Sequence, residues 1–354
     1  MTSFSLVVDG KTYAGWTEVR VQRSLDQFAH SFEMNYTDRW AEGDAPAALT
    51  VGAACQVKLD SFPLITGWLN QARISLSAGS IEATAAGRSK TGDLVDCAAI
   101  HKTGQWRNQT ALKIVRDIVA PFGIPVEADA QAAADAAQVK RFDLEDGESA
   151  FDAIDRLARL RAMLPTSTTA GALRFVRLTR SNGARVLRLD VSGAIRREWE
   201  NTDENRFSVY RIRSQTGRFS EDESPRRAAL EAFEVSDAAV KRYRPLVVQS
   251  ETGARLVELR DHATWIRNTR AAQAERVIYE FPGGLAPDGR PWEPGTFVAV
   301  DDRFLGVNEI LVIAAVTTTL NNTQFTTEIQ LARIEAYSTE PIPAKELSKK
   351  LKRI

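Results

Sequence analysis

The chain has 354 residues, a length that predicts two or three domains with a hydrophobic core in each. Hydrophobic residues make up 44% and charged residues 26%, a globular composition that excludes a disordered chain. The 46 Lys and Arg residues balance the 46 Asp and Glu residues. Nucleic-acid binding as the main task needs an excess of positive charge, which this sequence lacks. A net charge near zero also weakens repulsion between copies and favours an assembly component.

Cysteine and histidine are scarce, which limits the chemistry that the chain can perform. The two cysteines, Cys55 and Cys97, are too few for a disulfide framework, and there are three histidines. The first residues lack the pattern of a signal peptide, and no stretch approaches the roughly 20 apolar residues of a membrane span. We therefore expect a protein that is made and folds in a reducing cytoplasm, without stable membrane insertion.

Residues 1–98 have the pattern of a first antiparallel β-barrel domain. Apolar and polar residues alternate in several runs, and Gly, Asp and Pro turn formers separate them. These runs are 32–36, 55–60, 74–77 and 81–85. Several short strands at this spacing are typical of a barrel or a sandwich.

The period changes to that of helices in residues 99–190, which we interpret as an α+β insert domain. Apolar residues between 112 and 122 form one helical stripe with Asn108 as the expected cap, and a second stripe covers 151–160. Asn182-Gly183 then predicts a hairpin between the runs 173–178 and 186–189.

Strand patterns return in the C-terminal half. We expect returning strands and a connection at 191–225, and a second β-barrel domain at 226–340 that includes a helix at 252–275. Residues 341–354 carry four lysines and an arginine and are predicted to be a basic tail. Such a tail is suited to solvent, to nucleic acid or to an acidic partner.

The two β regions share a layout that indicates an internal duplication. In the first region Gly52 precedes predicted strands at 57–60, 65–69, 74–76 and 81–85. In the second region Gly295 precedes predicted strands at 298–301, 310–313, 316–320 and 325–331. Any two antiparallel meanders look broadly alike, so that alternative stays open. Two barrels per chain in a threefold ring would present six similar units.

Two motifs resemble binding sites without completing them. Gly87–Gly92 resembles the opening of a phosphate-binding loop, but Asp93 follows where that loop requires Lys, and its charge would repel a phosphate. Cys97 and His101 have the spacing of half a metal site, but no second pair follows. We expect a buried Cys97 and a surface His101 instead.

Carboxylates cluster at two places that could mimic the acid pair of a glycosidase. One cluster comprises Glu145, Asp146 and Glu148, and the other comprises Asp301 and Asp302. We interpret the first as the N-terminus of a helix, where negative charge is favourable, and the second as a turn after a strand. The seven tryptophans are scattered and are interpreted as core or interface anchors. We therefore expect no catalytic, cofactor or metal site.

Several stretches, taken in order, resemble one known family. They are Leu6–Gly10, Gly15–Ser24, Gly87–Cys97, Asp146–Phe151, Arg242–Val247 and Pro291–Gly295. Their order and spacing over residues 1–340 resemble the baseplate hub proteins of contractile phage tails, and most closely those of Mu and Mu-like prophages. The hubs of type VI secretion spikes and R-type bacteriocins are related to this family.

This resemblance implies a structural protein of the virion tail baseplate, assembled in the host bacterial cytoplasm. It implies a homotrimer whose two barrels per chain form a pseudo-sixfold ring. The ring would join a sixfold tail tube to a threefold central spike, would contact other baseplate proteins and would let DNA pass only as cargo. Because the net charge is zero, we expect neutral or acidic residues to face the channel. A tail-associated cell-wall hydrolase and a nucleic-acid-binding module are the alternatives.

Overall fold

The computed structural model describes residues 3–38, 49–77, 80–134, 138–160, 163–178, 186–215, 230–249 and 256–337. The chain divides into two compact units, each of which is described by itself. The first unit comprises Met1–Arg197, Ile278–Asn308 and Val312–Leu331. The second comprises Glu198–Val277, Glu309–Leu311 and Ala332–Ile354. The basic tail at 341–354 lies outside the described residues.

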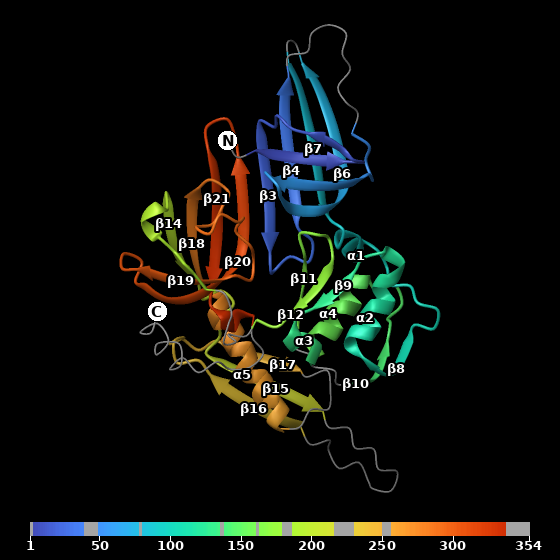
Figure 1. The fold of residues 1–354 in the computed structure, drawn as a ribbon. Coiled ribbons are helices and arrows are strands. Elements are labelled where there is room, and N and C mark those ends of the chain that lie inside the picture. Colours follow the sequence, from blue (N-terminus) through green and yellow to red (C-terminus); the bar gives the residue numbers. More distant parts are fainter. Residues whose placement is uncertain are drawn as a thin grey trace. The chain divides into compact units, whose positions relative to one another are not determined.

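Seven strands form the first β region, as the alternating runs predict (Figure 1). They are β1 (Phe4–Val8), β2 (Lys11–Tyr13), β3 (Glu18–Ser24), β4 (Ser31–Asp38), β5 (Ala54–Leu59), β6 (Phe62–Ser77) and β7 (Ser80–Ser89). The prediction of separate strands at 65–69 and 74–76 is wrong, because β6 is continuous through both. A bulge between Leu69 and Gln71 shifts its register and interrupts the alternation without ending the strand.

Six strands form the second β region. They are β13 (Val186–Arg188), β14 (Arg196–Asn201), β18 (Glu275–Pro282), β19 (Phe297–Asp302), β20 (Val307–Leu320) and β21 (Phe325–Ala332). The predicted strands 310–313 and 316–320 are again one strand, β20.

The strands of both regions belong to one 13-stranded sheet. Its main path runs β14-β18-β21-β20-β3-β4-β7-β6-β5-β1-β2, with β19 beside β20 and β13 beside β19. The expectation of two closed barrels is wrong for the described strands, because neither region closes on itself. Strand β20 pairs instead with β3 of the other region, from Ala315 opposite Ser24 to Leu320 opposite Val19. The coarser expectation, a mainly β chain with a few helices, is confirmed.

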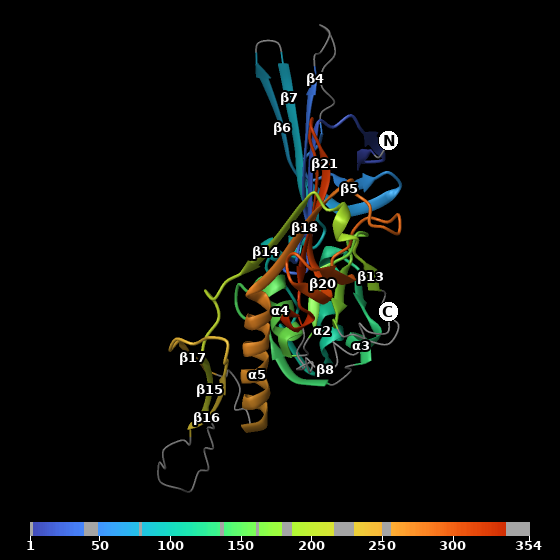
Figure 2. The ribbon, with the colours of Figure 1, turned by 90° about the vertical axis from the view of Figure 1, so that its left-hand side faces the viewer.

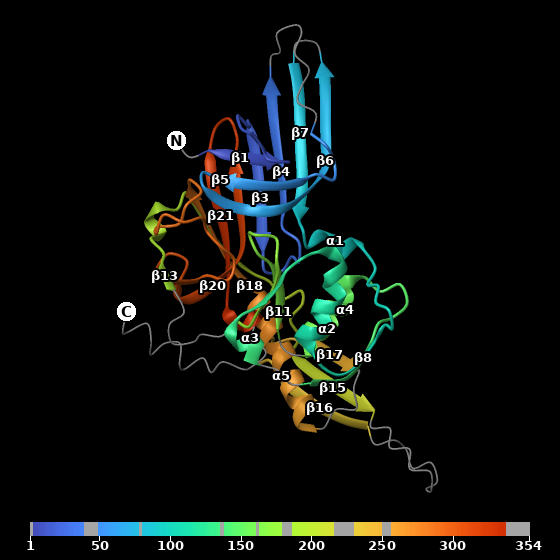
Figure 3. The ribbon, with the colours of Figure 1, turned by 45° about the vertical axis from the view of Figure 1, so that its right-hand side comes forward.

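The first β region has its own core. Figure 3 shows β1 and β5 crossing in front of β3 and β4. Buried side chains from these two layers meet between them, among them Leu6, Met34, Val57 and Leu59, all with 0% exposure. Burying one side chain of this size contributes roughly 1.5 to 3 kcal/mol, so this cluster holds the two layers together.

An α+β segment follows β7. It comprises α1 (Gly92–Asp96), β8 (Gln105–Thr110), α2 (Ala111–Val119), η1 (Ala120–Phe122), β9 (Val126–Ala128), α3 (Ala130–Ala134), β10 (Gln138–Asp143), α4 (Ala150–Leu160), β11 (Leu164–Ser167) and β12 (Leu173–Val176). The two predicted helices are confirmed as α2 and α4, and Ile114, Ile118, Ile154 and Leu157 are buried in their shared core. Thr110, not Asn108, caps α2 by accepting a hydrogen bond from the backbone N–H of Lys113.

The predicted hairpin between 173–178 and 186–189 is wrong. Strand β12 pairs with β11 on one side and with β9 on the other, so both of its edges are occupied. Strand β13 pairs in parallel with β19, from Val186 opposite Phe297 to Arg188 opposite Ala299. The turn signal Asn182-Gly183 lies outside the described residues.

The second unit contains a small sheet with the order β16-β15-β17 and a long helix (Figure 2). Its elements are β15 (Val209–Gln215), β16 (Leu230–Ser236), β17 (Pro245–Gln249), α5 (Leu256–Gln273) and η3 (Ile334–Ala336). The predicted helix is confirmed within 256–273. Ala263 and Ile266 of α5 pack with the buried Tyr210 and Ile212 of β15. None of the helices that the structure describes is both long and apolar enough to cross a membrane.

Close backbone packing of β6 on β7 requires glycine at Gly87. A Cβ atom there would lie 2.2 Å from the carbonyl oxygen of Trp68 and 2.7 Å from the ring of Phe32. We expect Gly87→Ala to lower the free energy of unfolding by at least about 2 kcal/mol, because this overpacking separates two paired strands. Thermal or urea unfolding measures the change.

Gly193→Ala is the matched control, because a Cβ atom at Gly193 would have nothing within 4 Å. It should change the free energy of unfolding by less than about 0.5 kcal/mol. Equal stability of the two variants would contradict this description of the β6–β7 contact.

Candidate functional site

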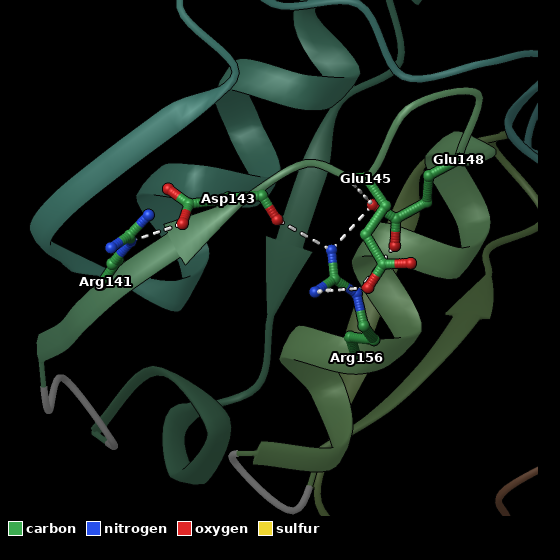
Figure 4. Close-up of polar contacts among 5 residues, drawn as sticks. All are labelled: Arg141, Asp143, Glu145, Glu148 and Arg156. Carbon is green, nitrogen blue, oxygen red and sulfur yellow. Dashed lines mark hydrogen bonds and ion pairs between the residues drawn. The ribbon is translucent and has the colours of Figure 1, made fainter. Parts of the chain in front are cut away.

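The acidic turn before α4 is the first candidate cluster (Figure 4). The carboxylate of Glu148 accepts hydrogen bonds from Arg156 at both oxygens, each at 2.7 Å. The same guanidinium donates to the carbonyl oxygen of Asp143 at 3.0 Å and lies 3.6 Å from a carboxylate oxygen of Glu145. Arg156 therefore ties the end of β10 and the acidic turn to α4.

Glu148 is fully engaged in holding this turn. Its side chain is only 6% exposed, and besides Arg156 it accepts the backbone N–H of Glu145 at 3.0 Å. Ser149 begins the helix by accepting the backbone N–H of Asp152 at 3.0 Å. The predicted placement at a helix N-terminus is confirmed. Glu145, Asp146 and Asp152 line a pocket of about 350 Å³ here.

Asp302 also has a structural role, that of a turn former. Its carboxylate accepts the backbone N–H groups of Phe304 at 2.9 Å and Leu305 at 3.1 Å. The hydroxyl of Tyr279 donates to it at 3.2 Å, and burial beside this carboxylate raises the pKa of Tyr279. Asp302 is buried whereas Asp301 is exposed, so the two carboxylates do not converge on one face.

The segment that resembles a phosphate loop connects β7 to α1, and its hydroxyls bond to the protein. The hydroxyl of Ser89 accepts the backbone N–H of His30 at 3.0 Å, and that of Thr91 donates to the carbonyl oxygen of Phe28 at 2.8 Å. Arg88 forms an ion pair with Asp96. These contacts fix the exit of the chain from the first β region.

The expectation of a buried Cys97 is wrong. Cys97 is an exposed thiol at the end of α1, whose inner face is provided by the buried Leu94. His101 stacks on Trp106, with ring centroids 4.3 Å apart. Within the described part of the chain, no group of three His, Cys, Asp or Glu residues could hold a metal ion.

A buried arginine at the β3–β20 junction was not predicted from the sequence. Arg23 of β3 is 3% exposed and donates a hydrogen bond to the backbone carbonyl of Trp292, which belongs to the second β region. Burial lowers the pKa of Arg23 to about 10, although Glu293 opposes the change. The contact joins Gly15–Ser24 and Pro291–Gly295, two of the stretches singled out in the sequence. The only signal in the sequence for this contact is that both stretches belong to the group that resembles the known family.

The tryptophans fill several of the expected roles. Trp16, Trp106 and Trp292 are buried, as core anchors are. Trp199, on the end strand β14, is 45% exposed. Trp40 lies outside the described residues. Ile74 of β6 is likewise a large apolar side chain exposed on a strand, at 46%.

We expect Glu148→Gln to lower the free energy of unfolding by about 2 kcal/mol, because a charge-assisted pair with Arg156 is lost from a mostly buried position. Glu145→Gln is the control and should change it by less than about 0.5 kcal/mol, since Glu145 is 74% exposed. Thermal unfolding measures both. If the parent protein digests peptidoglycan and the Glu148→Gln variant does not, the result would favour the hydrolase instead.

His30 should make stability depend on pH. Burial, together with the charge of Arg23, lowers its pKa from 6.5 to about 4. The unfolded chain therefore binds a proton that the folded chain excludes between pH 6.5 and 4, so stability is lost as the pH falls through that window. Between pH 7 and pH 4.5 the expected loss is about 2 kcal/mol.

Urea unfolding at pH 7 and at pH 4.5 measures this loss. His30→Asn should remove most of this pH-dependent loss of stability. His101→Asn is the control and should retain the loss, because it leaves the buried His30 in place. The same pH dependence in His30→Asn and the parent would refute the role of His30.

Two family models match adjacent stretches of the chain. Residues 3–89 match the N-terminal domain of Mu phage baseplate assembly proteins like GpP. Residues 91–177 match the second domain of baseplate hub proteins like gp44. The boundary between them falls where β7 ends and the α+β segment begins.

Comparison over the full length finds the same proteins. The baseplate hub protein gp44 of Escherichia phage Mu is 28% identical over 344 residues, which cover 94% of this chain and 88% of that protein. The 43 kDa tail protein of prophage MuSo2 from Shewanella oneidensis is 26% identical with a TM-score of 0.84, covering 95% of this chain and all of that one.

A component of the E. coli type VI secretion system shares the fold at 12% identity. Its TM-score is 0.57, and the match covers 95% of this chain and 79% of that one. The resemblance noted in the sequence is thereby confirmed: the chain is similar to the baseplate hub protein of phage Mu and to the tail protein of a Mu-like prophage.

Proposed function

We propose that this chain is the structural hub of a contractile phage tail baseplate and acts as a homotrimer. The observation that carries the proposal is that the sheet repeats one strand order, β3-β4-β7-β6-β5 in the first region and β14-β18-β21-β20-β19 in the second, and that β3 and β20 join the two regions edge to edge. Three chains with two such regions each would place six like units around one axis. That number suits a sixfold tail tube on one side and a threefold spike on the other.

The relatives support this role. The protein from phage Mu is named a baseplate hub. The E. coli neighbour is described as a component of the type VI secretion system that is itself structurally similar to tail proteins of phage T4. We propose the tail tube protein, the central spike protein and other baseplate proteins as partners. The assembly site would be the host cytoplasm, and the final location the virion baseplate.

The ring would leave a channel through which DNA passes as cargo. Because the formal net charge is zero, we propose that neutral or acidic residues face this channel and do not retain DNA. We also retain the division at residues 98, 190, 225 and 340 as part of the proposal. The first β region, the insert, the connection and the second β region would become parts of one ring.

Light scattering on the purified protein tests the trimer. Three chains of 39.1 kDa give a mass of about 117 kDa, which is the expected result. Co-purification with the spike protein of the same tail is the second expected result. A monomer that stays at 39.1 kDa at high concentration and does not bind the spike would contradict the hub.

A further inference from the structure

Although β1 is antiparallel to β5 and β13 is parallel to β19, the six strands compared in each β region follow the same order. In the first region it is β3-β4-β7-β6-β5-β1, and in the second it is β14-β18-β21-β20-β19-β13. Strand β6 is thus the counterpart of β20, and β14 is the counterpart of β3. The chain connects β3 to β4 by a short loop, whereas most of the second unit lies between β14 and β18 in the sequence.

Equivalent hydrogen bonds align β6 with β20. The N–H of Gly52 donates to the carbonyl oxygen of Leu69 at 2.8 Å, and the N–H of Gly295 donates to that of Ile313 at 2.8 Å. Both glycines have a left-handed backbone, with φ of 87° and 86°. Leu69 therefore corresponds to Ile313.

The hairpins that follow confirm this alignment. Ser77 lies eight residues after Leu69 and pairs with Ser80. Asn321 lies eight residues after Ile313, and its N–H donates to the carbonyl oxygen of Gln324 at 2.9 Å. Both turns therefore occur at the same place in the repeat.

A second pair of hydrogen bonds aligns β14 with β3. The N–H of Thr17, just before β3, donates to the carbonyl oxygen of Asn35 in β4 at 2.9 Å. The N–H of Ile195, just before β14, donates to that of Glu280 in β18 at 2.8 Å. Thr17 therefore corresponds to Ile195.

The edges of β6 and β14 correspond to those of β20 and β3, which pair with each other. Neither edge has a partner strand of this kind within the described chain. Strand β6 pairs with β5 as far as Trp68, and Leu69 bonds to Gly52 and Ala53 just before β5. Beyond Leu69, β6 pairs only with β7. Strand β14 lies at one end of the sheet and pairs only with β18. Unpaired strand edges of this kind invite another strand.

We infer that the edge of β6 from Ala72 to Ser77 pairs in antiparallel fashion with β14 of a neighbouring copy of this chain. Within the chain, Thr318 of β20 lies opposite Val21 of β3, and Thr317 lies opposite Gln22. Transferred to the counterparts, this register places Ile74 opposite Trp199 of the neighbouring copy and Arg73 opposite its Glu200.

The side chains in this register are complementary. Ile74 and Trp199, exposed at 46% and 45%, become a cross-strand apolar pair on one face. Arg73 and Glu200, both exposed, become an opposite-charge pair on the other face. Pairs of both kinds stabilise neighbouring strands.

The inference rests on the proposed function, that of a ring of identical chains. The edges of β6 and β14 are different surfaces of one chain, so a contact between them joins chains head to tail, and such an assembly closes as a ring. In a ring of three, each chain would provide one β6 edge and one β14 edge. Every β region would then have the same neighbours on both sides.

Cysteine cross-linking tests the register. Ile74→Cys and Trp199→Cys are combined in a Cys97→Ser chain, which keeps the buried Cys55, and the protein is oxidised. We expect the 39.1 kDa band on a non-reducing gel to shift to linked dimers and trimers of about 78 and 117 kDa. Arg73→Cys with Trp199→Cys is the off-register control, since these side chains face opposite sides of the sheet and should not link.

The possible outcomes test the strand register separately from the trimeric state. Trimeric mass by light scattering without the 74–199 link, or with equal linking of the control pair, would overturn the register and leave the hub standing. Monomeric mass would overturn both. The link formed only by the 74–199 pair would support both.

Charge exchange is a second test that needs no new covalent bond. Arg73→Glu should place like charges opposite each other and weaken each junction about fivefold in association constant. Glu200→Arg should have the same effect, and the double variant should restore the association of the parent. Failure of the double variant to recover, with both single variants folded, would contradict the proposed pair.

Discussion

The pairing of β20 with β3 is the interaction on which the rest of the structure depends. It turns two β regions, far apart in the sequence, into one continuous sheet. The buried guanidinium of Arg23 reinforces it through the carbonyl oxygen of Trp292, so that a polar contact also fixes the junction. Because β3 of the first region pairs with β20 of the second, neither region closes into a barrel by itself in the described part of the chain. The corresponding edges of β14 and β6 have no partner strand there.

The remaining elements are insertions into, or extensions of, the sheet that the two β regions form. The α+β segment follows β7 of the first region and is anchored by the hydroxyls of Ser89 and Thr91. The second unit is inserted between two neighbouring strands of the second region. Such insertions enlarge a repeat without changing its strand order. The acidic turn at Glu148 serves its own helix through Arg156, which explains the carboxylate cluster without a reaction.

Local patterns in the sequence predicted local structure well. Alternation located most strands, the helical stripes located α2, α4 and α5, and both carboxylate clusters were correctly interpreted as a helix start and a turn. What depends on distant partners was not predicted. The closing partner of β20 is nearly 300 residues away, the bulge in β6 hides its continuity, and Arg23 in an alternating strand looks like a surface residue.

The central claim is that the two β regions are copies of one unit that continues into neighbouring chains. Electron cryomicroscopy of the purified hub would test it most directly. The account predicts a ring in which first and second regions alternate around the axis, with a continuous sheet across every boundary. A ring whose chains meet through other surfaces, with the edges of β6 and β14 left in solvent, would contradict it.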